Sequence, residues 1–155
     1  IACAMPAAEM SFRDPAASIG VTSRFDGERM GGDWFVRGQL PPGADVYAVN
    51  FITLDQLPTM VISRADGELL RSTVWRGIER QPGRYEFRAD AGGAMRDLVV
   101  IWIDDDFRTA AIGEPAGGFA WVLDRNPTGG ADRIAAARDV LEFSGFDLSS
   151  METRP

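Results

Sequence analysis

The chain of 155 residues contains no histidine, no lysine and a single cysteine. Histidine is the commonest general base and a common zinc ligand, so its absence removes most familiar catalytic and metal chemistry. Without lysine, no Schiff base can form with a carbonyl compound. One cysteine permits neither an internal disulfide bond nor a cysteine cluster around a metal. We therefore expect a protein that is not an enzyme and that uses no cofactor and no metal.

Long apolar runs and clusters of basic residues are missing as well. No apolar run approaches the ~20 residues that a transmembrane helix needs. All 16 basic residues are arginines, and 23 acidic residues bring the net charge to −7. An acidic domain without basic clusters binds nucleic acids poorly, because contacts to phosphates supply most of that affinity. We expect no nucleic-acid partner, and the same charge disfavours docking on anionic lipid headgroups.

The residues that are present are typical of a globular domain built from short strands. The chain is 45% hydrophobic and 25% charged, and its 17 glycines and nine prolines fall between apolar runs. The length fits one domain, and frequent turn residues favour short strands. Residues 1–24 predict a tether with a lead-in, and residues 25–155 predict one folded domain.

Eight short runs of β-forming residues follow one another from residue 33. Two of the turns carry strong signals, because Pro41-Pro42-Gly43 ends the first run and Asp66-Gly67 is a hairpin dipeptide. The run over 84–89 alternates charged and aromatic residues, which is typical of a strand with one solvated face. The predicted strands cover residues 33–40, 46–54, 59–64, 70–78, 84–89, 98–103, 109–112 and 119–124.

The period of the apolar residues changes after the last of these runs. Over 131–143, Ile134, Ala137 and Leu141 recur at helical spacing, and Gly145 stands where a helix often ends in glycine. Eight strands followed by one helix predict an all-β fold, an eight-stranded antiparallel up-and-down barrel with one C-terminal α-helix packed outside. The interior of such a barrel holds side chains and one small ligand.

The alternation of side chains along a strand predicts which residues face the interior. On 98–103 we favour the face of Trp102 over that of Val99, Ile101 and Ile103, because it keeps a large aromatic residue inside. On 46–54 we favour the face of Tyr47 over that of Val46, Ala48 and Asn50. The predicted ligand-binding residues are Val36, Tyr47, Val49, Phe51, Leu98, Val100, Trp102, Phe119 and Trp121. Each of them fits equally well as a filler of a closed core.

Three short motifs accompany the strand pattern. Gly32-Asp33-Trp34 opens the first strand, residues 104–108 lie between the sixth and seventh, and Arg125 follows the eighth. Together these motifs resemble the signature of the lipocalin family, and residues 118–148 resemble the bacterial outer-membrane lipocalins related to apolipoprotein D. The resemblance spans residues 31–148, which is nearly the whole domain.

The resemblance assigns structural roles to Gly32, Trp34, Asp104 and Arg125. It implies that the Arg125 guanidinium lies over the Trp34 indole at the closed end of the barrel, where a cation–π contact contributes ~0.5–2 kcal/mol. Residues 104–106 are three consecutive aspartates. Because consecutive carboxylates on a turn point apart, we interpret them as solvated charges on a hairpin and not as a cation site.

The resemblance also implies a function, namely binding and transport or storage of a small apolar ligand such as a fatty acid or lysophospholipid. A ligand carboxylate would need a donor near the barrel mouth, for which Arg64, Arg76, Arg88 and Tyr85 are candidates. Two alternatives stay open. One is a barrel with a filled interior that binds another protein, and the other is a lipocalin-type isomerase or hydratase that uses Glu114 or Tyr85.

The first residues suggest a location. Ile1-Ala2-Cys3-Ala4 resembles the end of a bacterial lipoprotein signal, in which the cysteine is lipidated. The alternative is a free thiol in a tail. The lipoprotein interpretation predicts membrane anchoring through Cys3 and an outer-membrane protein that faces the periplasm, and without lipidation we expect a periplasmic protein. The oligomeric state is left open.

Overall fold

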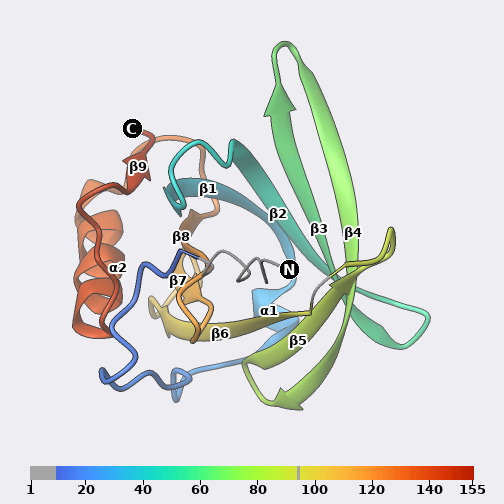
Figure 1. Ribbon diagram of the computed structural model, residues 1–155, viewed down its shortest axis with the longest axis horizontal. Coiled ribbons are helices and arrows are strands. Elements are labelled where there is room, and N and C mark those ends of the chain that lie inside the picture. The colour runs from blue at the N-terminus through green and yellow to red at the C-terminus, as the bar shows by residue number, and fades with distance from the viewer. Residues whose placement is uncertain (1–9, 94) are drawn as a thin grey trace, which may run out of the picture.

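The computed structural model describes residues 10–93 and 95–155. Figure 1 shows a strongly curved antiparallel sheet with the long helix α2 (Ala131–Phe143) outside it and one long hairpin that projects beyond the rest. Neither helix of the described residues is long and apolar enough to cross a membrane. Cys3 lies outside the described residues, so its lipidation stays a prediction.

The sheet closes on itself because its first strand, β1 (Gly32–Leu40), pairs with both β2 (Val46–Leu54) and β8 (Ala120–Asp124). Residues Gly32 to Phe35 pair with β2, and Phe35 to Leu40 pair with β8, with an irregularity between Val36 and Gly38. The predicted barrel of eight antiparallel strands with a C-terminal helix is therefore confirmed. The barrel strands are β1 (Gly32–Leu40), β2 (Val46–Leu54), β3 (Leu57–Asp66), β4 (Leu69–Gln81), β5 (Arg84–Ala89), β6 (Arg96–Ile103), β7 (Thr109–Gly113) and β8 (Ala120–Asp124).

The barrel has two ends, which differ in the elements that lie there. We call one end the mouth end, which carries the loops 41–45, 67–68, 90–95 and 114–119. We call the other the α1 end, because the short helix α1 (Gly27–Met30) lies there. Asp26 caps α1, since its carboxylate accepts hydrogen bonds from the backbone N–H groups of Glu28 and Arg29. Helix α1 has no counterpart in the predictions from the sequence.

Trp34 and Arg125 hold the α1 end together. The guanidinium carbon of Arg125 lies 3.7 Å from the centroid of a Trp34 ring, and Trp34 is completely buried. Arg125 also donates hydrogen bonds to the backbone carbonyls of Asp33, Arg29 and Phe107. The indole N–H of Trp34 donates to the carbonyl of Met30 at 2.8 Å. Both side chains therefore tie α1 to the barrel, as the family resemblance implies for this pair.

Gly32 completes this arrangement at the start of β1. Its φ angle of +93° is in the region that favours glycine, and an added Cβ would lie 3.4 Å from Nη1 of Arg125. Burial lowers the pKa of Arg125 below its ordinary value, and the charge of the nearby Asp33 offsets only part of this effect.

Asp104 corrects one expectation from the sequence. Its side chain is 9% exposed, and its carboxylate accepts hydrogen bonds from the backbone N–H groups of Arg108 and Thr109 and from Nε of Arg108. Burial raises the pKa of Asp104, but the hydrogen bonds from Thr109 and Arg108 outweigh it and leave this pKa below its ordinary value. Asp104 is thus a buried turn residue, whereas Asp105 and Asp106 are exposed as predicted.

The described residues contain no group of acidic, histidine or cysteine side chains that could hold a metal ion.

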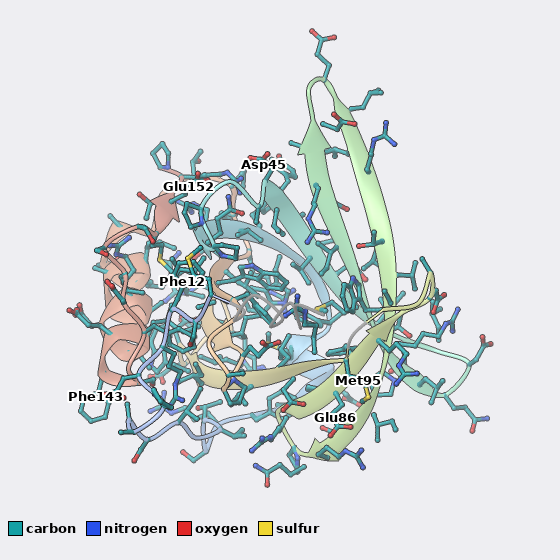
Figure 2. The ribbon with its side chains drawn as sticks, viewed as in Figure 1. Phe12, Asp45, Glu86, Met95, Phe143 and Glu152 are labelled. Carbon is teal, nitrogen blue, oxygen red and sulfur yellow. The ribbon has the colours of Figure 1, made fainter. Side chains whose placement is uncertain are left out.

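Helix α2 covers the outer face of β6, β7 and β8. Ala137 and Leu141 are completely buried there and Ile134 partly, which confirms the predicted apolar stripe. On the opposite side of the helix, Phe143 points away from the barrel into solvent (Figure 2) and is 89% exposed. Gly145 ends this region with a φ angle of +92°.

Residues 10–24 pack on the outside of the barrel, beside α2. Phe12, Ile19 and Val21 pack against the same apolar cluster as the helix. Arg13 is 8% exposed and donates hydrogen bonds to the backbone carbonyls of Ser144 and Pro115. The described part of the predicted tether and lead-in is therefore packed against the domain, and the boundary at residue 24 stays a prediction.

A ninth strand, β9 (Glu152–Thr153), pairs with β1 after α2 and was not predicted. Glu152 lies at the rim of the mouth end, beside the β1–β2 loop. Figure 2 shows it near Asp45 of that loop. Its carboxylate accepts hydrogen bonds from the side-chain amide of Gln39 and from the backbone N–H of Gly43. This end of the chain thereby fixes one side of the mouth.

Candidate ligand-binding site

The barrel interior is a single apolar cluster that leaves two cavities. Trp34, Val36, Val49, Met60 and Phe87 are among its most buried members. One cavity, which we call the upper chamber, lies under the loops of the mouth end. The other, which we call the lower chamber, lies beside α1. The side chains between the two chambers belong to the same cluster.

The upper chamber is small and mostly apolar. Its volume is about 180 Å³, and of its 12 lining residues only Arg64 and Arg96 are charged. Aromatic walls dominate it, and the rings of Phe119 and Trp121 lie 4.7 Å apart between centroids. The lining residues are Leu40, Pro41, Ala44, Val46, Met60, Ile62, Arg64, Trp75, Arg96, Gly118, Phe119 and Trp121.

The two arginines of the upper chamber differ in their surroundings. Arg96 lies 3.6 Å from the carboxylate of Glu114, whose side chain is 8% exposed. Arg64 lies on β3 in alternation with Met60 and Ile62, so all three side chains face the interior. Within residues 10–93 and 95–155, no ion pair or hydrogen bond involves the Arg64 side chain. One guanidinium group is therefore available to a ligand.

The lower chamber is larger and carries the opposite charge. Its volume is about 470 Å³, and Glu28 and Glu79 are its only charged lining residues. The Tyr85 hydroxyl donates a hydrogen bond to Glu79 at 3.1 Å, and its ring stacks on Phe87. Burial raises the pKa of Tyr85, and the charge of Glu79 raises it further, so the hydroxyl stays neutral. The lining residues are Gly27, Glu28, Met30, Gly31, Phe51, Ile52, Thr53, Pro58, Thr59, Glu79, Tyr85, Phe87, Leu98 and Val100.

The residues predicted to bind a ligand separate into three groups. Five line a chamber, namely Phe119 and Trp121 in the upper one and Phe51, Leu98 and Val100 in the lower one. Val36 and Val49 face the interior but line neither chamber, since they are buried within the cluster. Tyr47 and Trp102 do not face the interior. For the seven that do, contact with a ligand stays a prediction.

The inward orientation predicted for Tyr47 and Trp102 is wrong because both strands are irregular. The pairing of β2 with β3 shifts between Val46 and Ala48, so Val46 and Val49 both lie inside. Tyr47 is 39% exposed and meets Phe35 edge to face outside the barrel. A β-bulge changes the face of every later residue on its strand, which alternation alone cannot show.

Strand β6 contains a similar irregularity. Its pairing with β7 shifts between Val100 and Trp102, and Ile103 is the next residue after Val100 in the interior cluster. Trp102 instead packs against the outer cluster beneath α2. The aromatic residue that was expected inside the barrel therefore supports the helix outside it.

Other interior residues were missed because no inward face was assigned to 59–64, 70–78 and 84–89. Met60, Ile62 and Trp75 line the upper chamber, and Phe87 lines the lower one. The alternation of Tyr85 and Phe87 with charged residues was a usable signal for β5. For β3 and β4 no comparable signal separates the two faces.

The candidates for a headgroup donor also separate. Arg64 lines the upper chamber and Tyr85 lines the lower one. Arg76 is engaged on the surface by Asp55 and Asp90, and Arg88 is exposed. Of these four candidates, only Arg64 therefore combines a positive charge with a position inside the barrel.

Comparison with known proteins supports the fold. No family model and no curated protein matches the chain. Among solved structures, the chain is similar to the crystal structure of the major allergen Per a 4 from cockroaches, with a TM-score of 0.65 and 10% sequence identity. The similarity covers 91% of this chain and 95% of that one. Identity this low shows the fold alone, and the chain therefore has a lipocalin-like barrel.

Proposed function

We propose that this protein binds a small hydrophobic molecule inside its barrel. The observation that carries the proposal is the upper chamber, whose walls are almost entirely apolar and include Trp75, Phe119 and Trp121. Proteins with a lipocalin-like fold typically bind such ligands. Two chambers inside the barrel also favour a ligand carrier over a filled barrel that serves only as a surface for another protein.

The volume of the upper chamber limits what it can enclose. At ~30 Å³ for each water-sized group, a cavity of about 180 Å³ encloses about six such groups. Each buried methylene contributes ~0.8 kcal/mol, against association costs of at least ~4 kcal/mol. We infer that the site takes a short alkyl chain, or the end of a longer fatty acid or lysophospholipid whose remainder lies at the mouth.

We propose transport or storage and not catalysis as the biological role. The neutral Tyr85 is a poor base, because its raised pKa keeps the proton on the hydroxyl. We propose further that the protein acts at the bacterial envelope, anchored through a lipidated Cys3. Mass spectrometry of the membrane fraction tests this location, since lipidation adds a defined mass that is lost in a Cys3→Ser variant.

Native mass spectrometry of the protein made in a bacterial host, followed by organic extraction, tests the binding itself. The expected result is a co-purified amphiphile that a fluorescent lipid probe displaces. An Ile62→Trp variant fills the upper chamber and is expected to lose the probe while keeping its circular dichroism spectrum. The proposal fails if the protein is free of ligand and no lipid probe binds at tens of micromolar.

A further inference from the structure

From the charges inside the barrel, we propose that the upper chamber selects a singly charged anionic amphiphile and that Arg64 holds its head group. This inference rests on the proposed function, because it requires that the upper chamber binds a ligand at all. Beyond the proposed function, it specifies the charge of the ligand and the residue that binds the charged group. The starting observation is that both charged lining residues of this chamber are arginines.

Arg64 is unusual among the arginines of this chain. It faces the interior next to Met60 and Ile62, and its side chain is partly buried. Its guanidinium meets no carboxylate of the described residues. A charged side chain that lies against apolar walls without a partner loses part of its hydration, which costs free energy. A bound anion offsets this cost. The site therefore favours an anionic ligand over a neutral one of equal size.

Neighbouring residues add little net charge to the upper chamber. Arg71 stands directly opposite Arg64 in the β3–β4 ladder, so both lie on the same face. Arg71 is paired with Asp66, and this largely exposed pair adds no net charge. Arg96 adds a second guanidinium to the chamber wall, although Glu114 neutralises much of its charge. Among the lining residues and their ion-pair partners, the charge of Arg64 is the one that remains, which suits a single anionic group.

The lower chamber makes the preference directional. It contains Glu28 and Glu79 and no basic lining residue, so an anion is repelled there. An anionic head group is thus stabilised only at the mouth end, with its alkyl chain against Trp75, Phe119 and Trp121. The planar guanidinium of arginine presents two parallel N–H groups, which match both a carboxylate and a phosphate.

Four ligands with the same eight-carbon chain test the inference: octanoate, octyl phosphate, octanol and octylamine. Binding is measured at pH 7.5 by titration calorimetry and by tryptophan fluorescence, to which Trp75 and Trp121 in the chamber wall contribute. We expect octanoate to bind at least about tenfold more tightly than octanol, as a charge-assisted hydrogen bond implies. Octylamine is expected not to bind in the upper chamber. Octyl phosphate carries close to two negative charges at this pH, so tighter binding of octyl phosphate than of octanoate would overturn the preference for a single charge.

Three variants assign the effect to one residue. Arg64→Gln is expected to weaken octanoate binding about tenfold and to leave octanol binding unchanged. Arg64→Lys keeps the charge and is expected to retain part of the preference. Arg88→Gln is the matched control, because Arg88 is exposed on the same sheet and outside both chambers. Since the Arg64 side chain makes no hydrogen bond or ion pair with the described residues, we expect its variants to fold.

The outcomes separate this inference from the proposed function. If octanol and octanoate bind equally well, the barrel binds hydrophobic ligands but charge selection by Arg64 is overturned. If Arg64→Gln keeps the full preference, the assignment to Arg64 is overturned. If none of the four ligands and no lipid probe binds, the proposed function itself fails.

Discussion

The contact between Arg125 and Trp34 gives the sharpest prediction for stability. Replacing Arg125 with alanine removes a guanidinium that lies 3.7 Å from the indole centroid. It also removes three hydrogen bonds to backbone carbonyls, two of them in exposed surroundings. The cation–π contact contributes ~0.5–2 kcal/mol, and partly solvated hydrogen bonds add ~0.5–1 kcal/mol each. We expect Arg125→Ala to lower the free energy of unfolding by about 2–5 kcal/mol.

A double-mutant cycle isolates the direct contact from the hydrogen bonds. Urea unfolding is followed for the unmodified protein, Arg125→Ala, Trp34→Phe and the double variant. A coupling energy of about 1 kcal/mol is expected, because phenylalanine offers a weaker face to the cation. Arg125→Lys keeps the charge but loses the guanidinium N–H groups that reach the carbonyls of Asp33 and Arg29. Its stability is expected to lie between that of the unmodified protein and that of Arg125→Ala.

The reasoning is refuted if Arg125→Ala costs less than about 0.5 kcal/mol, the range of an ordinary surface substitution. A large loss with no coupling between the two sites would refute the cation–π contact alone and leave the hydrogen bonds as the cause. Both results are read from the same unfolding curves.

Three further predictions concern other parts of the barrel. Asp104→Asn is expected to lower stability by about 1–2 kcal/mol at neutral pH; because the folded protein holds the pKa of Asp104 below its ordinary value, this difference disappears as the pH falls below ~4. Gly77→Ala would place a Cβ 2.6 Å from the ring of Phe87, and an expected loss of about 1–3 kcal/mol follows from this overlap. Phe119→Ala is expected to weaken probe binding several-fold, because the ring lines the upper chamber, whereas Tyr47→Ala removes an exposed ring and leaves binding unchanged.

Each of these has a result that contradicts it. A pH-independent loss in Asp104→Asn would show that charge plays no part in the turn. A melting temperature of Gly77→Ala equal to that of the unmodified protein would mean that the Phe87 ring moves at no cost. Equal effects of Phe119→Ala and Tyr47→Ala on the probe would place the ligand outside the upper chamber.

The strand pattern and the motifs of the sequence were sufficient to predict the barrel. Turn residues separate all eight strands, and the change of period at residue 131 marks the start of α2. Trp34 and Arg125 could be paired from the family resemblance alone, and the structure brings them into contact. These features depend on local propensity and on residue order, which the sequence contains directly.

The interior could be predicted only in part. Alternation holds along a regular strand, so Leu98 and Val100 were placed correctly until the irregularity before Trp102 changed the face. Helix α1 is a single turn without an apolar stripe, and β9 is only two residues long. The carboxylate of Asp104 accepts hydrogen bonds from the backbone N–H groups of Arg108 and Thr109 in the same turn, and the pattern of charges in the sequence does not reveal these bonds.

The opposite charges of the two chambers determine the orientation in which an amphiphile with a negative head group would bind under the proposed function. Two arginines line the upper chamber and two glutamates line the lower one, so the alkyl chain is expected to enter first. The head group would then be the last group to enter and the first to meet solvent on release. Added salt is therefore expected to weaken binding, because it screens the charge of Arg64 at the rim.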